Sequence, residues 1–288
     1  MRKPWKLSLL LVLALVIAGV PLLGLSGCSI IGAESFDYRD VKAEDGTDAV
    51  SLYRYTGESR KDKLVIPDEV KGKRVVRINT YALSNAEYLT EITLGKYVET
   101  IEAWAITKCL KLEKIAVAEG NEHFVVKDNI LYTQDMKSLV LCPNVLRGKD
   151  DGGKPNFCEV TLPEGVERIG TTAFYCTETL TQVRLPASLR YIDSFAFHYA
   201  KELTSLNLPA GLLSIGRDAF SYCDKMKGSV TIPASVMTIG DYAFFSEGSS
   251  IGEFIVERYT GEGSRSLGVD WVPSKLGSVS DKVTVREV

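Results

Sequence analysis

The stretches "LPEGVERIGTTAFYCTETL" (162–180), "LPASLRYIDSFAFHYAKEL" (185–203) and "LPAGLLSIGRDAFSYCDKM" (208–226) align with one another without gaps. A fourth copy, "IPASVMTIGDYAFFSEGSSI" (232–251), needs one extra residue. Three residue types recur in register every 23 or 24 residues: Pro163, Pro186, Pro209 and Pro233; Ile169, Ile192, Ile215 and Ile239; Phe174, Phe197, Phe220 and Phe244. A fixed period of this length indicates a stack of repeated units whose neighbouring copies share one core.

Each copy predicts the same local structure. Alternating pieces such as "LTQVRL" (180–185) are typical of short β-strands, and the proline that follows ends the strand because it has no N–H to donate. The glycine after the isoleucine favours a tight turn, and the "AF" pair is expected to form a single helical turn with its Phe inside. We therefore predict an α/β repeat solenoid, built mostly of short strands with single helical turns.

Two earlier copies are looser but keep the period: "IPDEVKGKRVVRINTYALSNAEYL" (66–89) and "LGKYVETIEAWAITKCLKL" (94–112). The repeated unit resembles the treponemal-type, BspA-like leucine-rich repeat family, whose pattern reads I-P-x-x-[VL]-x-x-I-G-x-x-A-F-x-x-C-x-x-L. The resemblance covers residues 64 to about 254, with departures at Asn79, Glu102 and Asp193 in the glycine position. It implies a domain for adhesion to, or interaction with, proteins of a host or neighbouring cell, and some members bind extracellular-matrix components.

The period divides the leucine-rich repeat domain, which we place at 49–288. Residues 49–66 resemble the family's N-terminal cap, the repeats occupy 64–114 and 160–251, and 252–288 are expected to form a C-terminal cap with Trp271 as its plug. The period fails over 115–159, where "HFVVKDNILYT" and "SLVLCP" flank the turn "QDMK". We expect a β-hairpin that protrudes from the solenoid, followed by a polar loop, "NVLRGKDDGGKPNF".

The N-terminus has the pattern of an export signal, with three basic residues before the apolar run Leu7–Val20. "LSGC" (25–28) resembles the cleavage box of bacterial lipoproteins, which implies a signal peptide over 1–27 and two or three acyl chains on Cys28. A plain signal peptide or an uncleaved anchor helix is the alternative. Residues 28–48 are expected to be a polar tether, so the protein would be exported and lipid-anchored to the outer face of the bacterial membrane or cell surface.

The composition argues against catalysis and against nucleic-acid binding. The net charge is −3, without a basic patch, and His123 and His198 are the only histidines. No C-x-x-C pair occurs, and "GSSIG" (248–252) matches a hydrolase motif whose strand should precede the serine, whereas the strand-like segment here follows it. We predict no enzyme activity, no cofactor, no metal and no nucleic-acid partner, and a monomer.

The cysteines fall into two groups. Cys109, Cys176 and Cys223 lie beside core positions, where cysteine acts as a small buried hydrophobe. Cys142 and Cys158 bracket the polar loop and would face an oxidising environment. A disulfide between them is a hypothesis; closing a loop of ~15 residues would stabilise the fold by roughly 3 kcal/mol.

Two rows of side chains are candidates for ligand contact. The first lies just past successive core positions and would form a ridge of rings with large contact area: Tyr175, His198, Tyr199, Tyr222 and Phe245. The alternative is that these rings only pack half-buried against one another. The second is a polar row on the outward strand positions: Thr93, Arg184, Asn207 and Thr231.

Together these patterns predict an exported, membrane-anchored, non-catalytic binding protein. Its partner would be a protein or glycan, bound through the solenoid in cell-surface adhesion or protein–protein interaction. The alternative is an envelope-associated structural scaffold that binds peptidoglycan or another lipoprotein.

Overall fold

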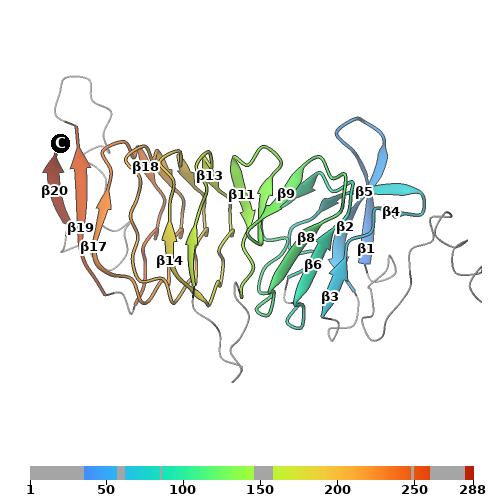
Figure 1. Cartoon of the computed structure of the whole chain (residues 1–288), viewed down its shortest axis with the longest axis horizontal. Helices are drawn as coiled ribbons and strands as arrows, with labels where there is room; N and C mark the ends of the chain where they lie inside the picture. The colour runs from blue at the N-terminus through green and yellow to red at the C-terminus, as the bar shows by residue number, and fades with distance from the viewer. Residues whose placement is uncertain (1–35, 57–61, 85, 146–157, 248–249, 260–282) are drawn as a thin grey trace, which may run out of the picture.

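The structure is a computed structural model that describes residues 36–56, 62–84, 86–145, 158–247, 250–259 and 283–288. It is a β-solenoid of about eight turns, in which the strands of successive turns lie side by side from one end of the molecule to the other (Figure 1). The repeat solenoid predicted from the 23-residue period is therefore confirmed.

One side of the solenoid carries the leucine-bearing strands, which pair in parallel. They form three separate sheets: β3 (Lys63–Val65), β6 (Glu91–Leu94) and β8 (Lys114–Val117); β12 (Cys158–Thr161) and β14 (Leu180–Arg184); β17 (Lys227–Ile232), β19 (Ser250–Arg258) and β20 (Val283–Glu287). Between β14 and β17 the row is reduced to a single bridge from Gln182 to Ser205.

A second side carries the short strands that contain the repeated isoleucines. It forms two sheets: β1 (Phe36–Lys42), β2 (Asp48–Tyr55), β5 (Lys73–Ile78), β4 (Glu69–Val70) and β7 (Thr100–Ile101); then β9 (Phe124–Lys127), β10 (Ile130–Thr133), β11 (Ser138–Leu141), β13 (Arg168–Ile169), β15 (Tyr191–Ile192), β16 (Ser214–Ile215) and β18 (Thr238–Ile239). Isoleucine pairs with isoleucine in register from β13 to β18. The isoleucine period is thus a ladder of in-register strands.

The third side consists of hydrogen-bonded turns. The sequence predicts single helical turns there, but no helix occurs in the described residues. The Phe174 N–H donates to the Ala196 carbonyl (2.7 Å) and the Phe197 N–H to the Ala219 carbonyl (2.7 Å), so each turn bonds to the next one. A left-handed residue interrupts each segment, for example Phe195 at φ 59°, and an α-helix requires right-handed residues throughout. The α/β description is not confirmed.

The repeated glycines serve close packing between turns. A Cβ on Gly216 would lie 2.3 Å from the Ser194 nitrogen, and a Cβ on Gly240 would lie 2.2 Å from the Arg217 nitrogen. Both glycines lack a left-handed φ, so the close contact with the neighbouring turn, and not the backbone conformation, is what requires glycine there. In the second copy of the ladder, after Ile192 of β15, Asp193 occupies this position and binds Arg168 at 2.5 Å.

The repeated phenylalanines form one stack through the core. Successive ring centroids from Phe174 through Phe197 and Phe220 to Phe244 are 4.7, 4.9 and 5.0 Å apart, with the rings nearly parallel. These spacings follow the distance of about 4.8 Å between neighbouring strands. Phe254 of β19 closes the stack edge-on, 5.1 Å from Phe244. Trp271, the expected plug, lies outside the described residues.

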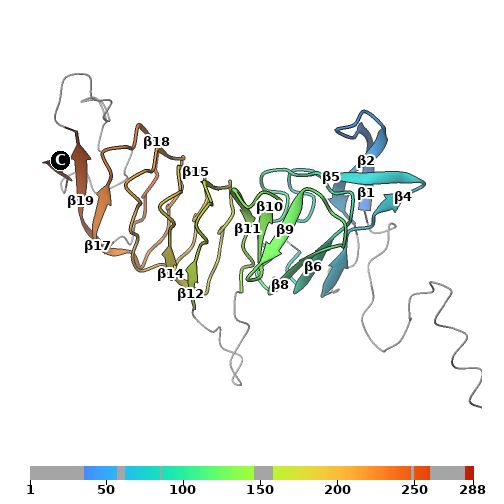
Figure 2. The ribbon, with the colours of Figure 1, turned by 45° about the horizontal axis from the view of Figure 1, so that its top comes forward.

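The hairpin predicted over 115–159 does not protrude. Strands β9, β10 and β11 pair antiparallel at one end of the seven-stranded sheet and cross the solenoid between its two parts (Figures 1 and 2). We call these three strands the dividing sheet. Its two faces enter different cores: Leu131 and Leu141 pack with the N-terminal core, whereas Tyr132 and Leu139 pack with the C-terminal core. Both faces are apolar, and burying both stabilises the sheet far more than exposing one to water.

Part of the predicted N-terminal tether (28–48) is folded into the domain. Residues 36–42 of the expected tether form β1, which pairs antiparallel with β2 and buries Phe36 in the N-terminal core. The signal peptide (1–27) and Cys28 lie outside the described residues. Within the described part of the chain, no helix is long and apolar enough to cross a membrane.

Candidate ligand-binding surface

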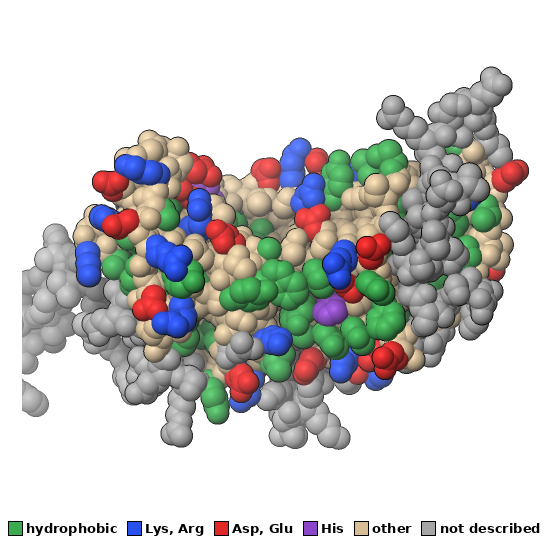
Figure 3. All heavy atoms as spheres, turned by 180° about the vertical axis from the view of Figure 1, so that it is seen from behind, with side chains coloured by type: hydrophobic (Ala, Val, Ile, Leu, Met, Phe, Trp, Pro, Cys, Tyr) green, Lys and Arg blue, Asp and Glu red, His purple; other side chains and the backbone are tan. Residues whose placement is uncertain are grey.

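The predicted aromatic row forms a continuous chain of ring contacts on the turn side of the solenoid. Ring centroids are 5.6 Å apart for Tyr175 and His198, 4.5 Å for His198 and Tyr199, 4.7 Å for Tyr199 and Tyr222, and 5.5 Å for Tyr222 and Phe245. All five side chains are half-buried. Figure 3 shows a patch of hydrophobic side chains gathered around one histidine on this face. The rings pack on one another and also keep exposed surface, so contact with a ligand stays a prediction.

Four residues that sequence reasoning missed extend this row. The nine residues together, which we call the aromatic surface, are Tyr81, Trp104, Tyr175, Phe195, His198, Tyr199, Tyr222, Tyr242 and Phe245. The indole of Trp104 lies 5.2 Å from Tyr175 and 4.9 Å from Phe195, so it joins the surface across the dividing sheet. A signal in the sequence could have found the four: each lies three residues after the ladder isoleucine of its own copy.

The backbone fixes the direction of several of these rings. Trp104, Tyr199 and Tyr222 are left-handed, with φ of 66°, 60° and 57°. This conformation costs a residue with a side chain roughly 1–2 kcal/mol. Hydrogen bonds between turns offset the cost, since the Tyr199 N–H donates to Ser221 (3.0 Å) and the Tyr222 N–H to Phe245 (2.7 Å). The rings are thus held by the same backbone ladder that stacks the repeats.

His198 lies at the centre of the aromatic surface. Its Nδ1 is 2.8 Å from the Ser221 hydroxyl, and its ring stacks on Tyr175 at an interplanar angle of 13°. Burial lowers the pKa of His198 below its ordinary value, and the Asp218 carboxylate opposes this shift with a smaller effect. The imidazole is therefore neutral at pH 7 and adds a polar, uncharged edge to the surface.

Three asparagine side chains hold the dividing sheet to the repeats. Asn121 donates to the carbonyls of Gly95 (2.9 Å) and Val98 (3.0 Å), and Asn129 donates to Glu113 (2.6 Å). Asn144 donates to two carbonyls of the next copy, at positions 175 (2.9 Å) and 176 (2.8 Å). These side-chain bonds take the place of backbone hydrogen bonds between turns where the period fails. The two bonds from Asn144 also position Tyr175 of the aromatic surface.

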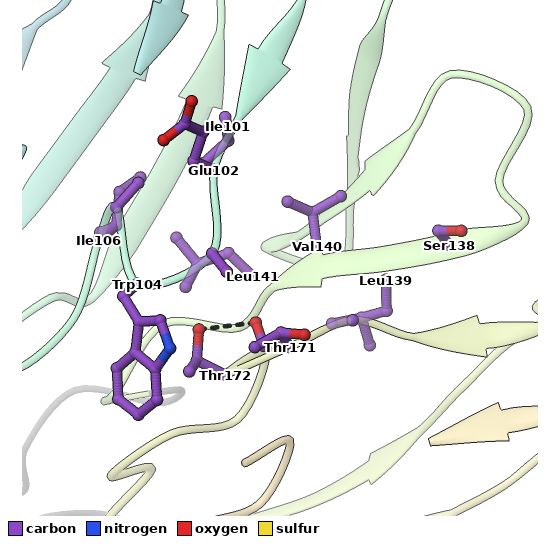
Figure 4. Close-up of a pocket in the computed structure, with 13 residues that line it drawn as sticks. Ile101, Glu102, Trp104, Ile106, Ser138, Leu139, Val140, Leu141, Thr171 and Thr172 are labelled. Atoms are coloured by element: carbon purple, nitrogen blue, oxygen red, sulfur yellow. Dashed lines mark hydrogen bonds between the residues drawn. The ribbon is translucent and has the colours of Figure 1, made fainter. Parts of the chain in front are cut away.

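Two hollows meet at Trp104. The first, a cavity of about 240 Å³, opens between the two parts of the solenoid and is lined mainly by apolar side chains. Figure 4 shows Ile106 and Leu141 beside it, with Trp104 near Thr172, whose hydroxyl donates to the Thr171 carbonyl at 2.6 Å. The second, a cavity of about 650 Å³, lies on the other side of the indole. We call it the basic cavity; the residues used below are Arg54, Tyr81, Ser84, Trp104, Thr107, Lys108 and Tyr175.

The predicted polar row lies on the strand side of the solenoid. Thr93, Arg184 and Thr231 lie on β6, β14 and β17, and Asn207 lies outside the strands. Arg184 is paired with Glu159 of the neighbouring strand at 3.4 Å. Residues of this row are partly or fully exposed, and their contact with a ligand stays a prediction.

The structure contains no disulfide between Cys142 and Cys158, although both side chains are buried. Burial raises the pKa of the Cys142 thiol well above its ordinary value, and the proximity of Cys158 raises it further. Cys109 and Cys223 are also buried, as expected for core positions, and Cys176 is partly exposed. The bridge stays a prediction, because the two thiols lie near each other.

No cluster of histidine, cysteine and carboxylate side chains in the described residues could hold a metal ion. Ser250 of the "GSSIG" motif begins β19, so the strand follows the serine, whereas a nucleophile elbow requires the strand before it.

Stacked repeats form a solenoid with an extended surface, which repeat proteins in general use to bind partners. The chain belongs to the BspA-type leucine-rich repeat family, whose model matches residues 53–147 and 153–258 in six copies. The family resemblance predicted from the repeat is confirmed.

Solved structures of other leucine-rich repeat proteins are similar. One from Eubacterium ventriosum has 15% identity over 77% of each chain and a TM-score of 0.47. The pneumococcal vaccine antigen PcpA has 21% identity over 80% of this chain and 69% of its own, with a TM-score of 0.49. The leucine-rich repeat protein of T. pallidum has 21% identity over 89% and 86%, with a TM-score of 0.31. No curated protein matches the chain.

Proposed function

We propose that this protein is exported, carries lipid on Cys28, and binds a protein or glycan at the cell surface through the aromatic surface, without catalysing a reaction. The observation that carries the proposal is the continuous row of nine rings over the turn side. Rings supply a large contact area at low cost in conformational entropy, and partners bind most strongly through such residues. Two of them, Tyr81 and Tyr242, are 58% and 48% exposed.

The binding test uses the full chain in detergent and a panel of immobilised matrix proteins, mucin-type glycans and peptidoglycan fragments. Saturable binding to a host protein or glycan is expected, and the double variant Tyr199→Ala, Tyr222→Ala should weaken it at least tenfold. The control is Arg184→Ala, Asn207→Ala on the strand side, which should bind like the wild type. Binding to peptidoglycan alone would favour the envelope scaffold instead.

The export part of the proposal has a separate test. Replacing Cys28 by serine should abolish incorporation of labelled fatty acid and move the protein out of the detergent phase on phase separation. Protease added to intact cells should remove the wild-type domain, whereas an inward-facing scaffold would resist it.

A further inference from the structure

The basic cavity combines three aromatic walls with positive charge. The Trp104 indole forms its centre, 6.2 Å from the Tyr81 ring and 5.2 Å from the Tyr175 ring. The Tyr81 ring is inclined by 38° to the Trp104 ring, and the Tyr175 ring by 70°. The rings therefore form walls of a recess instead of a flat stack. Its volume of about 650 Å³ lies within the range of small-molecule sites.

The charge in the cavity comes from two cations, and no carboxylate lies among the described residues that line it. Arg54 is already bound to Asp37, at 2.7 and 3.0 Å, so its charge is largely neutralised. Lys108 makes no ion pair with any residue that the structure describes, and it is exposed at the edge of the cavity. Lys108 is thus a cation available to a negative ligand.

Hydroxyl groups complete the lining. The buried Thr107 hydroxyl donates within the protein, to the Ser84 hydroxyl (3.3 Å) and the Trp104 carbonyl (3.2 Å), so it is left to accept from a ligand. Ser84 also lines the cavity and is only partly buried. Hydroxyls both donate and accept hydrogen bonds, so they suit a ligand that carries hydroxyls of its own.

We propose that the basic cavity binds a carboxylate-bearing sugar residue, such as a uronic or sialic acid at the end of a glycan. Ring faces pack against the apolar face of a pyranose, Lys108 pairs with the carboxylate, and the hydroxyls of Ser84 and Thr107 meet those of the sugar. The volume of about 650 Å³ suits one or two sugar rings packed against the three aromatic walls. This inference rests on the proposed binding function and names its ligand class.

The test measures affinity by calorimetry and by Trp104 fluorescence, with the lipid-bearing chain that begins at Cys28, in detergent and in a Trp271→Phe background. The probes are digalacturonate with its neutral methyl ester, sialyllactose with lactose, and triglutamate as the acidic peptide. At least one acid should bind, with its neutral counterpart several-fold weaker. Lys108→Gln should weaken the acid about fivefold and leave the neutral sugar unchanged, the effect of one exposed ion pair.

Two further variants separate the cavity from the rest of the surface. Tyr81→Ala, at an exposed ring, should weaken both members of a pair, whereas Lys225→Gln, outside the cavity, should change neither. No binding of either acid, equal binding of acid and neutral sugar, or binding of triglutamate alone would overturn the inference. If panel ligands require Tyr199 and Tyr222 but no acid binds, the proposed function survives and this inference fails. If an acid binds but no panel ligand does, the cavity binds the acid and the proposed role of the wider aromatic surface fails.

Discussion

The rings of Tyr199 and Tyr222 lie stacked, one repeat apart, with centroids separated by 4.7 Å and planes inclined by only 8°. Inside the solenoid, Phe197 and Phe220 stack in nearly the same way, at 4.9 Å and 9°. Each of these two copies therefore sends one ring inward and another outward from the same turn. Since the outer rings share a backbone with the inner ones, the spacing of the core determines the spacing of the aromatic surface.

Phe220→Ala should lower the free energy of unfolding by about 3–5 kcal/mol, because it removes a buried ring between two stacked neighbours and leaves a cavity. Urea unfolding followed by circular dichroism measures the change. Phe220→Leu, which fills most of the volume, should lose clearly less. A loss below about 1 kcal/mol in Phe220→Ala would show that the stack is not the main source of core stability.

Tyr222→Gly should be more stable than Tyr222→Ala, by about 1 kcal/mol, which reverses the usual order. Both variants lose the ring, but only glycine adopts the left-handed φ of 57° without strain. Exposed Met237 has no left-handed φ and provides the comparison, since alanine should be the more stable replacement there. Thermal unfolding of the four variants checks the prediction, and the same order at both sites would contradict it.

His198 should make stability fall as the solution is acidified. Its pKa is lowered in the folded state from 6.5, chiefly by burial, so below pH 6.5 the unfolded chain binds the proton more readily. The stabilisation is complete above pH 6.5 and is lost as the pH falls toward the folded pKa. The wild type should therefore lose more stability than His198→Gln between pH 7 and pH 5, as measured by urea unfolding at each pH. Equal losses would show that His198 titrates normally.

Asn144→Ala should lower the free energy of unfolding by about 1–3 kcal/mol, because two carbonyls in the next copy lose their donor. The emission of Trp104 should also change, since its neighbour Tyr175 is one of the residues held. Asn207→Ala on the exposed strand side should stay within about 0.5 kcal/mol of the wild type. A matching loss in both variants would argue against a specific role for Asn144.

Cys142 should resist alkylation in the folded protein, because burial both shields its thiol and raises its pKa. Iodoacetamide labelling before and after denaturation, read by mass spectrometry, tests this. If the disulfide with Cys158 forms on export, neither cysteine reacts even after denaturation until a reductant is added. Rapid labelling of native Cys142 would contradict its burial.

The structural features that the sequence predicts correctly are those whose spacing follows the repeat period. The ladder isoleucines and the stacked phenylalanines follow from in-register recurrence, and five members of the aromatic surface follow from their offset to the core. The dividing sheet could not be placed this way. Its alternating apolar residues look like a half-buried hairpin, and nothing local shows that Leu131 and Tyr132 enter different cores. Trp104, like Phe195 and Tyr242, was missed because the row was predicted only from positions after the repeated phenylalanine, whereas these residues lie before it or before its substitute, Ile106.

The dividing sheet separates a part of the solenoid in which the number of repeat copies can vary from a part in which it cannot. C-terminal to it, each copy contacts only its neighbours, so duplication or loss of one copy would lengthen or shorten the row of rings by one step. The basic cavity draws on residues from both sides of the sheet, Trp104 before it and Tyr175 after it. Gene rearrangements among the copies after the one that contains Tyr175 would thus alter the reach of the surface while leaving this cavity intact.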